Sequence, residues 1–220
     1  MARKLPEVRS IKRRIASVQP KLIIVVCCEG KNTEPKYFQN FAFAHGNKLV
    51  KIETIPAAGS PLTLVNRAIS EKDIRTKAAS RKKDSFAKAF EVWGVFDIDE
   101  HPKISEAKDL ARHNGIKLCI SNPCFDLWGL LHFVNQDGNV HRHVAQRKLA
   151  AAMPGYTTAD GKYFNYPLMH PLYSTAKSRA EMLMRRRNEE GSPGGNPSTD
   201  VYLLLDLIIK NGLPIQAKST

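Results

Sequence analysis

Apolar and polar positions along the first half of the chain form segments of two kinds. Apolar runs at 21–27, 92–96 and 116–120 each predict a strand that is covered on both faces of a sheet. A further run, 49–55, alternates polar and apolar residues except at Val50, which predicts a half-exposed strand of the kind found at a sheet edge. The pattern therefore predicts four strands.

Helical spacing separates these strands. A helix is expected from residue 33 to about residue 46, and its inward face carries Tyr37, Phe38, Phe41 and Ala44. Further helices are expected from 61 to the charged stretch before 85, and over 104–114. Strands that alternate with helices build a mostly parallel sheet with helices on both faces. We therefore predict a doubly wound α/β core with a four-stranded sheet.

The second half of the chain is predicted to be helical. Helices are expected over 125–133, 141–153 and 172–187. A final helix is expected to begin with Asn196 as its cap and Pro197 in its first turn. Its inward residues would be Leu203, Leu204, Leu207 and Ile208.

Three parts are predicted in the chain: a basic arm at 1–20, the α/β core at 21–135, and a helical extension packed on the core at 136–220. Hydrophobic residues make up 42% and charged residues 25%, which is typical of an ordinary globular protein. No apolar run reaches the roughly 18 residues of a membrane span, and the N-terminus lacks the apolar segment of a secretory signal. We therefore expect a cytoplasmic protein without a membrane partner.

Net charge points to a polyanionic partner. The chain has 34 Lys and Arg against 21 Asp and Glu, a net charge of +13. Basic side chains that neutralise phosphates release condensed counterions, which drives binding to nucleic acid. Besides the N-terminal arm, two dense basic runs are predicted to contact a nucleic-acid backbone, and they consist of Arg81, Lys82, Lys83, Arg185, Arg186 and Arg187.

Acidic residues follow two of the buried strands. Glu29 comes two residues after the first apolar run, and Asp97 and Asp99 follow the third strand. The carboxyl ends of parallel strands meet at one crevice of an open sheet, so these three carboxylates should converge. A loose carboxylate cluster suits Mg²⁺ or Mn²⁺, which keeps several waters and binds substrate phosphates. The sequence leaves open whether Glu29 holds the metal or moves a proton.

Other polar residues near these strand ends have weaker signals. Lys31 lies in the turn after the first strand and could meet a phosphate at the crevice mouth. Asn122, after the fourth strand, either orients a water, holds the loop, or caps the next helix. His132 sits among apolar helix residues and is interpreted as a core or rim histidine.

Cysteine and serine chemistry is not favoured. The four cysteines, Cys27, Cys28, Cys119 and Cys124, form no CxxC pair and are interpreted as small buried residues. Ser121 and Cys124 have no histidine nearby in the sequence to activate them as nucleophiles.

Several segments together carry a family resemblance. Glu29-Gly30 followed by TEPKYF at 33–38, and then Val95-Phe96-Asp97-Ile98-Asp99, resembles the Toprim (topoisomerase-primase) catalytic fold. With SNPCFDLW at 121–128 and NPST at 196–199, the chain is more closely similar to the RloB-like family of bacterial anti-phage and restriction-linked proteins.

The resemblance implies a Mg²⁺-dependent nuclease. Glu29 would match the Toprim glutamate, and Asp97 and Asp99 the metal-binding aspartates. It also implies an effector encoded beside an ATPase of the ABC or overcoming-lysogenisation type. At position 126 the family would have glutamate, and the shorter Asp126 is expected to act beside the metal rather than on it. Residues expected next to the metal ligands or on the substrate are Gly30, Lys31, Thr33, Glu34, Asn122 and Asp126.

The main prediction is thus a metal-dependent nuclease that hydrolyses DNA or structured RNA such as tRNA, in antiviral defence, and a homodimer is left open. One alternative is a module that binds nucleic acid or regulates the ATPase partner without cleaving. A weaker alternative is nucleotidyl transfer to a small phosphate substrate. The segment AAGS at 57–60 is too poor in glycine for a nucleotide-binding phosphate loop, so ATP binding by this chain is not expected.

Overall fold

The computed structural model describes residues 20–82, 89–98, 101, 103–157 and 162–213. The predictions made for residues 1–19 of the basic arm, for Asp99, for Lys83 and for the side chain of Lys82 lie outside what is described. Within these ranges, no helix combines the length and the apolar character that a bilayer crossing requires.

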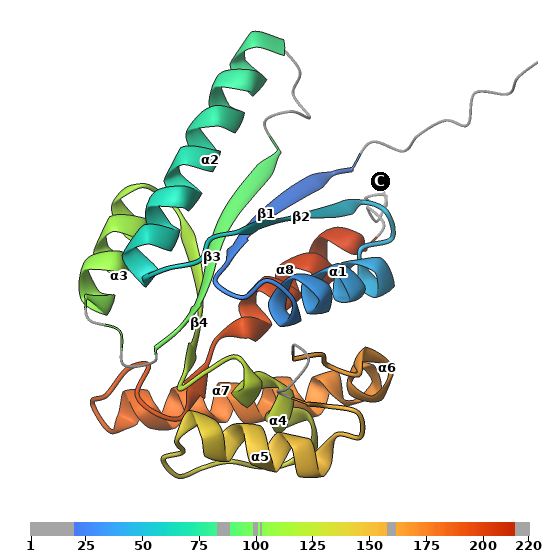
Figure 1. Cartoon of the computed structure of the whole chain (residues 1–220). Coiled ribbons are helices and arrows are strands. Elements are labelled where there is room, and N and C mark those ends of the chain that lie inside the picture. Colours follow the sequence, from blue (N-terminus) through green and yellow to red (C-terminus); the bar gives the residue numbers. More distant parts are fainter. Residues whose placement is uncertain (1–19, 83–88, 99–100, 102, 158–161, 214–220) are drawn as a thin grey trace, which may run out of the picture.

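A single mixed sheet forms the centre of the fold (Figure 1). Its strand order is β2-β1-β3-β4-β5, in which the first four strands pair in parallel and β5 pairs antiparallel to β4. The strands are β1 (Leu22–Cys28), β2 (Val50–Pro56), β3 (Phe90–Asp97), β4 (Lys117–Asn122) and β5 (Ser198–Thr199). The four predicted strands and the mostly parallel α/β sheet are confirmed, with β2 at the edge, and β5 is an addition.

Helices cover both faces of this sheet. Side chains of β1 alternate between the faces, so Ile24 and Val26 pack with one group of helices and Val25 and Cys27 with the other. The first face is covered by α1 (Thr33–His45) and α8 (Val201–Gly212), and the second by α2 (Pro61–Lys82) and α3 (Ile104–His113). This arrangement explains why β1 and β3 read as almost uninterrupted apolar runs.

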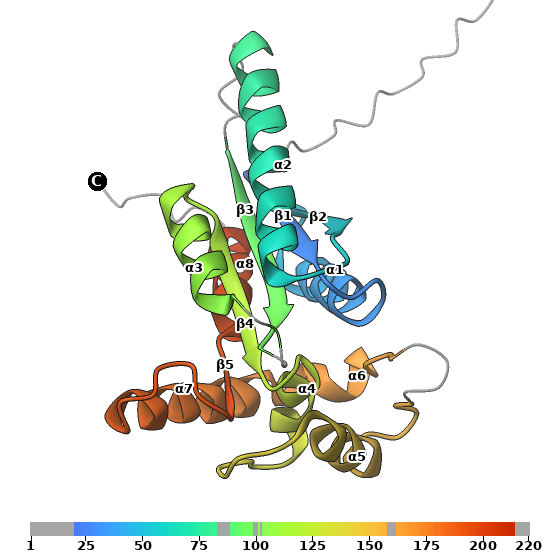
Figure 2. The ribbon, with the colours of Figure 1, turned by 60° about the vertical axis from the view of Figure 1, so that its left-hand side comes forward.

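A further helical layer lies across the carboxyl ends of the strands, as Figures 1 and 2 both show. It consists of α4 (Asp126–Phe133), α5 (Arg142–Ala152), α6 (Tyr166–Met169), the short 3₁₀ helix η2 (His170–Leu172) and α7 (Tyr173–Glu189). α6 and η2 were not predicted, whereas α4, α5 and α7 match the expected helices to within about two residues. The layer places polar groups of the second half of the chain opposite the strand ends.

The start of the last helix differs from the prediction. Residues 198–199 pair with β4 as β5, so α8 begins only at Val201, and Asn196 is not its cap. The side chain of Asn196 instead bonds both backbone groups of Val140. Val201 is the first buried residue of α8, and the other buried positions follow it at helical spacing. Leu203, which was predicted to face inward, is therefore 47% exposed. The buried residues of α8 are Val201, Leu204, Leu205, Ile208 and Gly212.

The largest buried cluster joins α1 to the helical layer. Tyr37, which is 2% exposed, meets Phe38, Phe125 and Trp128 edge-on at ring-centroid distances of 6.0 to 6.5 Å. The expected inward face of α1 is confirmed except at Ala44, which is exposed, because Ala42 takes the buried position near the helix end. The four cysteines are free and buried, as predicted. This packing fixes the N-terminus of α1 against the layer.

Candidate active site

A polar pocket of about 280 Å³ opens at the carboxyl ends of β1 and β3. Its lining includes side chains of both charges: Glu29, Glu34, Asp97 and Asp126 with Lys31, Arg142 and Lys162. The acidic residues come from the strand ends and the starts of α1 and α4, and two of the basic residues come from the helical layer. The pocket therefore lies where an open parallel sheet binds its ligands.

Register brings the first two acidic residues together. β1 and β3 are neighbours, with Cys28 opposite Val95, and the Glu29 amide donates to the Val95 carbonyl at 3.2 Å. Asp97 ends β3 two residues beyond that contact. The predicted convergence of Glu29 and Asp97 is thus what the structure shows, while Asp99 lies outside the described residues.

One oxygen of Glu29 has no hydrogen-bond partner among the described residues. Glu29 Oε1 lies 3.6 Å from Nε2 of His101, which was not predicted to be near the site. Glu29 Oε2 is buried and accepts no hydrogen bond within the described part of the chain. A buried carboxylate oxygen in this condition is destabilising unless a ligand satisfies it.

Two neighbouring carboxyls are electrostatically crowded. Burial raises the pKa of Asp97 well above its ordinary value, and the negative charges of Glu34, Glu29 and Asp126 raise it further. Burial likewise raises the pKa of Glu34, with Asp126 and Glu29 adding to the shift. The ammonium of Lys162 acts in the opposite direction on both groups. The pocket therefore favours bound protons or a bound cation.

Gly30 makes room for one of these carboxyls. A Cβ atom at this position would lie 2.6 Å from Cδ of Glu34, so any larger residue would displace the Glu34 carboxylate. Its φ is not positive, and the glycine is therefore required by the close approach of Glu34 rather than by the turn. Gly30 lines the pocket beside Glu29, next to the expected metal ligands as the sequence predicted.

The donor chemistry of the pocket fits a hard divalent cation. Glu29, Glu34 and Asp97 offer carboxylate oxygens, one of them unpartnered, and their mutual repulsion would be relieved by positive charge. Among the described residues, however, no three His, Cys, Asp or Glu side chains already stand in ligating positions. Closing on a cation would therefore need side-chain rotation in this group or a ligand from Asp99.

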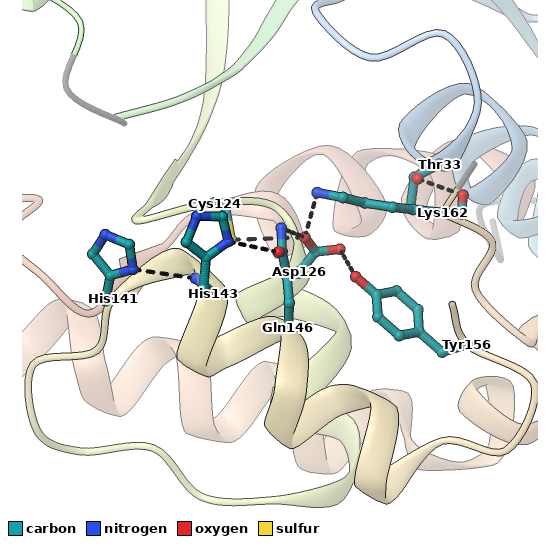
Figure 3. A network of polar contacts seen from close by, with 8 residues as sticks. All are labelled: Thr33, Cys124, Asp126, His141, His143, Gln146, Tyr156 and Lys162. Atoms are coloured by element: carbon teal, nitrogen blue, oxygen red, sulfur yellow. Dashed lines mark hydrogen bonds and ion pairs between the residues drawn. The ribbon is translucent and has the colours of Figure 1, made fainter. Parts of the chain in front are cut away.

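Asp126 lines the pocket, is 2% exposed, and is surrounded by donors (Figure 3). Its Oδ2 accepts from Nζ of Lys162 at 2.8 Å and from Nε2 of Gln146 at 2.9 Å, and its Oδ1 accepts from the Tyr156 hydroxyl at 2.9 Å. Sequence reasoning placed Asp126 beside the site but missed these three partners. They lie 20 to 36 residues away in segments without a recognisable motif, so no local signal could have found them.

The remaining predicted site residues are structural or lie at the rim. Lys31 is exposed at the pocket mouth, and the Thr33 hydroxyl donates to the backbone carbonyl of Lys162 at 2.6 Å. Asn122 donates to the Gly194 carbonyl at 2.9 Å and so holds the loop before β5, while the cap of α4 is Phe125. Of the three roles considered for Asn122, holding the loop is the one observed, and capping the helix was wrong.

His132 and Ser121 are part of the protein interior. His132 is 2% exposed, with Nδ1 2.9 Å from the Trp128 carbonyl oxygen, and burial lowers its pKa to about 4. Its interpretation as a core histidine is confirmed. The Ser121 hydroxyl bonds to that of Thr199 across β4 and β5 at 2.8 Å. Neither side chain lines the pocket.

The described side chains of the two internal basic runs do not line the pocket. α2 begins near the carboxyl edge of the sheet and runs back along the strands, so its C-terminal end, which contains Arg81, lies away from the carboxyl ends of the strands (Figure 1). In α7, Arg186 pairs with Asp137 at 2.9 Å, and Arg187 bonds the Asn196 carbonyl at 2.9 Å and Glu190 at 2.6 Å. Arg185 is exposed. Their predicted contact with nucleic acid remains a prediction.

Comparison with protein families gives a match over most of the chain. The family model described as RloB-like protein matches residues 24–208, a range that runs from β1 to α8 and contains every pocket residue named above. No curated protein and no solved structure matches the chain. On the extent of this match, the chain belongs to the RloB-like protein family.

Proposed function

We propose that this protein is a divalent-cation-dependent nuclease that hydrolyses phosphodiester bonds in DNA or structured RNA, with Mg²⁺ or Mn²⁺ as its cofactor. One observation carries the proposal. Glu29, Glu34 and Asp97 share a pocket at the carboxyl ends of two adjacent parallel strands, with raised pKa values for Asp97 and Glu34 and an unpartnered oxygen on Glu29. These are the conditions that a bound cation relieves.

A Toprim-like arrangement of the core is part of this proposal. The parallel order β2-β1-β3-β4, with Glu29 directly after β1 and Asp97 at the end of β3, supports the resemblance noted from the sequence. Asp99 follows Asp97 by two residues and would complete the acidic set.

The pocket residues divide into two roles. Glu29, Asp97 and Asp99 would hold the cation, which supplies positive charge and a water of lowered pKa when it is bound. Alternatively, Glu29 would accept the proton of an attacking water through its unpartnered oxygen instead of holding the cation. Lys31 at the rim and Arg142 in the lining would contact phosphates of the substrate backbone.

A cleavage assay tests the proposal. The purified chain is incubated with plasmid DNA and with total tRNA in Mg²⁺, in Mn²⁺ and in EDTA. We expect cleavage of one of these pools only with a divalent cation, and loss of cleavage in Glu29→Gln and Asp97→Asn at an unchanged circular dichroism spectrum. The control is Lys210→Gln, an exposed residue of α8 outside the pocket lining. Full activity in the two acidic-site variants contradicts the assignment.

A second candidate is a module that binds nucleic acid without cleaving it. It is favoured by Lys162, whose ammonium partly opposes the rise in the pKa values of Asp97 and Glu34. This ammonium thereby supplies part of the positive charge that a bound cation would provide. This candidate predicts salt-sensitive binding that is indifferent to Mg²⁺ and yields no product. The same gel, run with and without EDTA, separates the two candidates.

We also propose, from the family resemblance, that the nuclease acts as an effector of anti-phage defence together with an ATPase encoded nearby. The test is phage plating on cells that express both proteins. We expect protection with the wild-type chain and its loss with Glu29→Gln. Equal protection by the variant would show that a defence role, if present, does not use this pocket.

A further inference from the structure

Asp126 is better suited to hold a neighbouring side chain than to bind a metal. Both of its oxygens are occupied, Oδ1 by the Tyr156 hydroxyl and Oδ2 by Gln146 and Lys162, all within 2.9 Å. These donors come from α5, from the segment after it, and from the segment before α6. A buried carboxylate with three strong donors is a satisfied group. Besides the negative charge that it adds to the pocket, its contact there is with the ammonium of Lys162, which it holds in place.

Lys162 is held at both its ends. The Thr33 hydroxyl, at the first residue of α1, donates to its backbone carbonyl, and its Nζ lies 2.8 Å from Asp126. Figure 3 shows the extended side chain spanning from the α1 side of the pocket to Asp126. Two anchors remove much of the rotamer freedom of a lysine, so the charge has a defined position.

The ammonium of Lys162 has bonding capacity to spare. Its side chain is 30% exposed in a pocket that also contains Glu29 and Asp97. An ammonium carries three donors, and the hydrogen bond to Asp126 is the only one it makes within the described ranges. Because the carboxylates of the strand ends repel a phosphate, a cation held in a defined position in the same pocket would attract one, in addition to Lys31 and Arg142.

We propose that Lys162, oriented by Asp126, is a phosphate-binding residue of the pocket and contacts a non-bridging oxygen of the nucleic-acid backbone. This inference deepens the proposed function, on which it rests for the identity of the substrate. Lys162 would touch the substrate, whereas Asp126 acts through Lys162 as a positioning residue, with Gln146 and Tyr156 fixing its carboxylate. The pocket then has an acidic side for a cation and a basic side for a phosphate.

Binding without cleavage is the first test. Fluorescence anisotropy follows labelled single-stranded DNA and an RNA stem-loop in EDTA over a range of salt concentrations. For Lys162→Gln we expect about tenfold weaker binding to the preferred probe. The slope of log affinity against log salt should fall by about one. Lys162→Arg should retain most of the affinity, and the matched control Lys210→Gln should bind like wild type. Wild-type affinity and slope in Lys162→Gln overturn the proposal.

The test of Asp126 must distinguish positioning of Lys162 from simple electrostatic repulsion of the substrate by the Asp126 carboxylate. If Asp126 only repels the substrate, Asp126→Asn should tighten binding. If it positions Lys162, the effect of Lys162→Gln should shrink to less than about threefold in the Asp126→Asn background, because the two residues act as one unit. Additive effects of the two substitutions contradict positioning.

A second measurement uses the wild-type protein and so does not depend on variants that fold. Lysines are acetylated with an activated acetate ester, with and without the RNA stem-loop in EDTA, and the modified residues are identified by mass spectrometry. We expect protection of Lys162 but not of Lys210. Equal modification of Lys162 with and without RNA overturns the subsite. If Lys162 is protected but Mg²⁺ produces no cleavage, the phosphate site stands and the nuclease proposal fails. If Mg²⁺ produces cleavage but RNA does not change the acetylation of Lys162, the nuclease proposal stands and the phosphate site fails.

Discussion

Replacing Asp97 should stabilise the protein increasingly as the pH rises, provided that no divalent cation is present. In the folded protein, burial and the charges of Glu34, Glu29 and Asp126 raise the pKa of Asp97 well above 3.8. The folded state therefore retains a proton that the unfolded chain has released. Between the pKa of Asp97 in the unfolded chain and its higher pKa in the folded protein, the free energy of unfolding falls as the pH rises, because the unfolded state binds fewer protons. Asp97→Asn removes that dependence.

The magnitude follows from one proton. A full proton difference gives a slope of about 1.4 kcal/mol per pH unit. In a chain of this length each kcal/mol shifts Tm by about 2–4 °C. The Tm of Asp97→Asn minus that of wild type should thus rise by about 3–6 °C per pH unit above the ordinary pKa of the group. Glu34 titrates in both proteins, but its charge is coupled to that of Asp97, so the difference in Tm reports the removal of Asp97 together with its effect on Glu34.

The assay is thermal unfolding followed by circular dichroism in EDTA, in steps from about pH 5 to about pH 7. Mg²⁺ in a parallel series should reduce the difference between the two proteins, because a bound cation stabilises the ionised carboxylate that only wild type has. A difference in Tm that stays constant with pH refutes the reasoning, since it would show that Asp97 is ionised in the folded protein throughout.

Three further predictions test the surroundings of the pocket. Gly30→Ala should displace the Glu34 carboxylate and abolish cation-dependent cleavage on a gel while leaving the circular dichroism spectrum unchanged, and full activity would contradict the close-approach argument. Tyr156→Phe leaves Asp126 without one donor and should lower the free energy of unfolding in urea by about 1–3 kcal/mol, whereas no change would mean that water replaces the hydroxyl. The imidazole of His132 should titrate in NMR spectra with a pKa of about 4, and a value near 6.5 would contradict its burial as a neutral group.

Much of the core could be predicted because its signals are local. β1 and β3 are buried on both faces, so each is a short apolar run, and the residue after each run is placed at the same edge of the sheet by parallel pairing alone. Glu29 and Asp97 could therefore be brought together without any knowledge of tertiary contacts. Gly30 was found in the same way, although the carboxylate it accommodates could be seen only in the structure.

The rest of the site depends on contacts that the sequence does not encode locally. β5 contains two residues and pairs with β4, which is 76 or more residues away, and Asp200 reinforces that pairing by accepting from the Ile120 amide. A strand of two residues is too short to show an alternation of apolar and polar residues in the sequence. Because residues 198–199 form this strand, α8 begins at Val201, later than predicted. Lys162 lies in a loop, and only the fold of the helical layer brings it to Asp126.

The central claim is that this pocket binds a divalent cation through Glu29 and Asp97, and a Mn²⁺ titration followed by electron paramagnetic resonance tests it most directly. We predict one Mn²⁺ site per chain in wild type, and we expect Mg²⁺ to compete for it. Mn²⁺ should bind more tightly as the pH rises from about 6 to about 8, because carboxyl protons must leave before the cation binds. The site should be lost in Asp97→Asn but not in Lys210→Gln. Equal Mn²⁺ binding by wild type and Asp97→Asn, or none by wild type, would contradict the account.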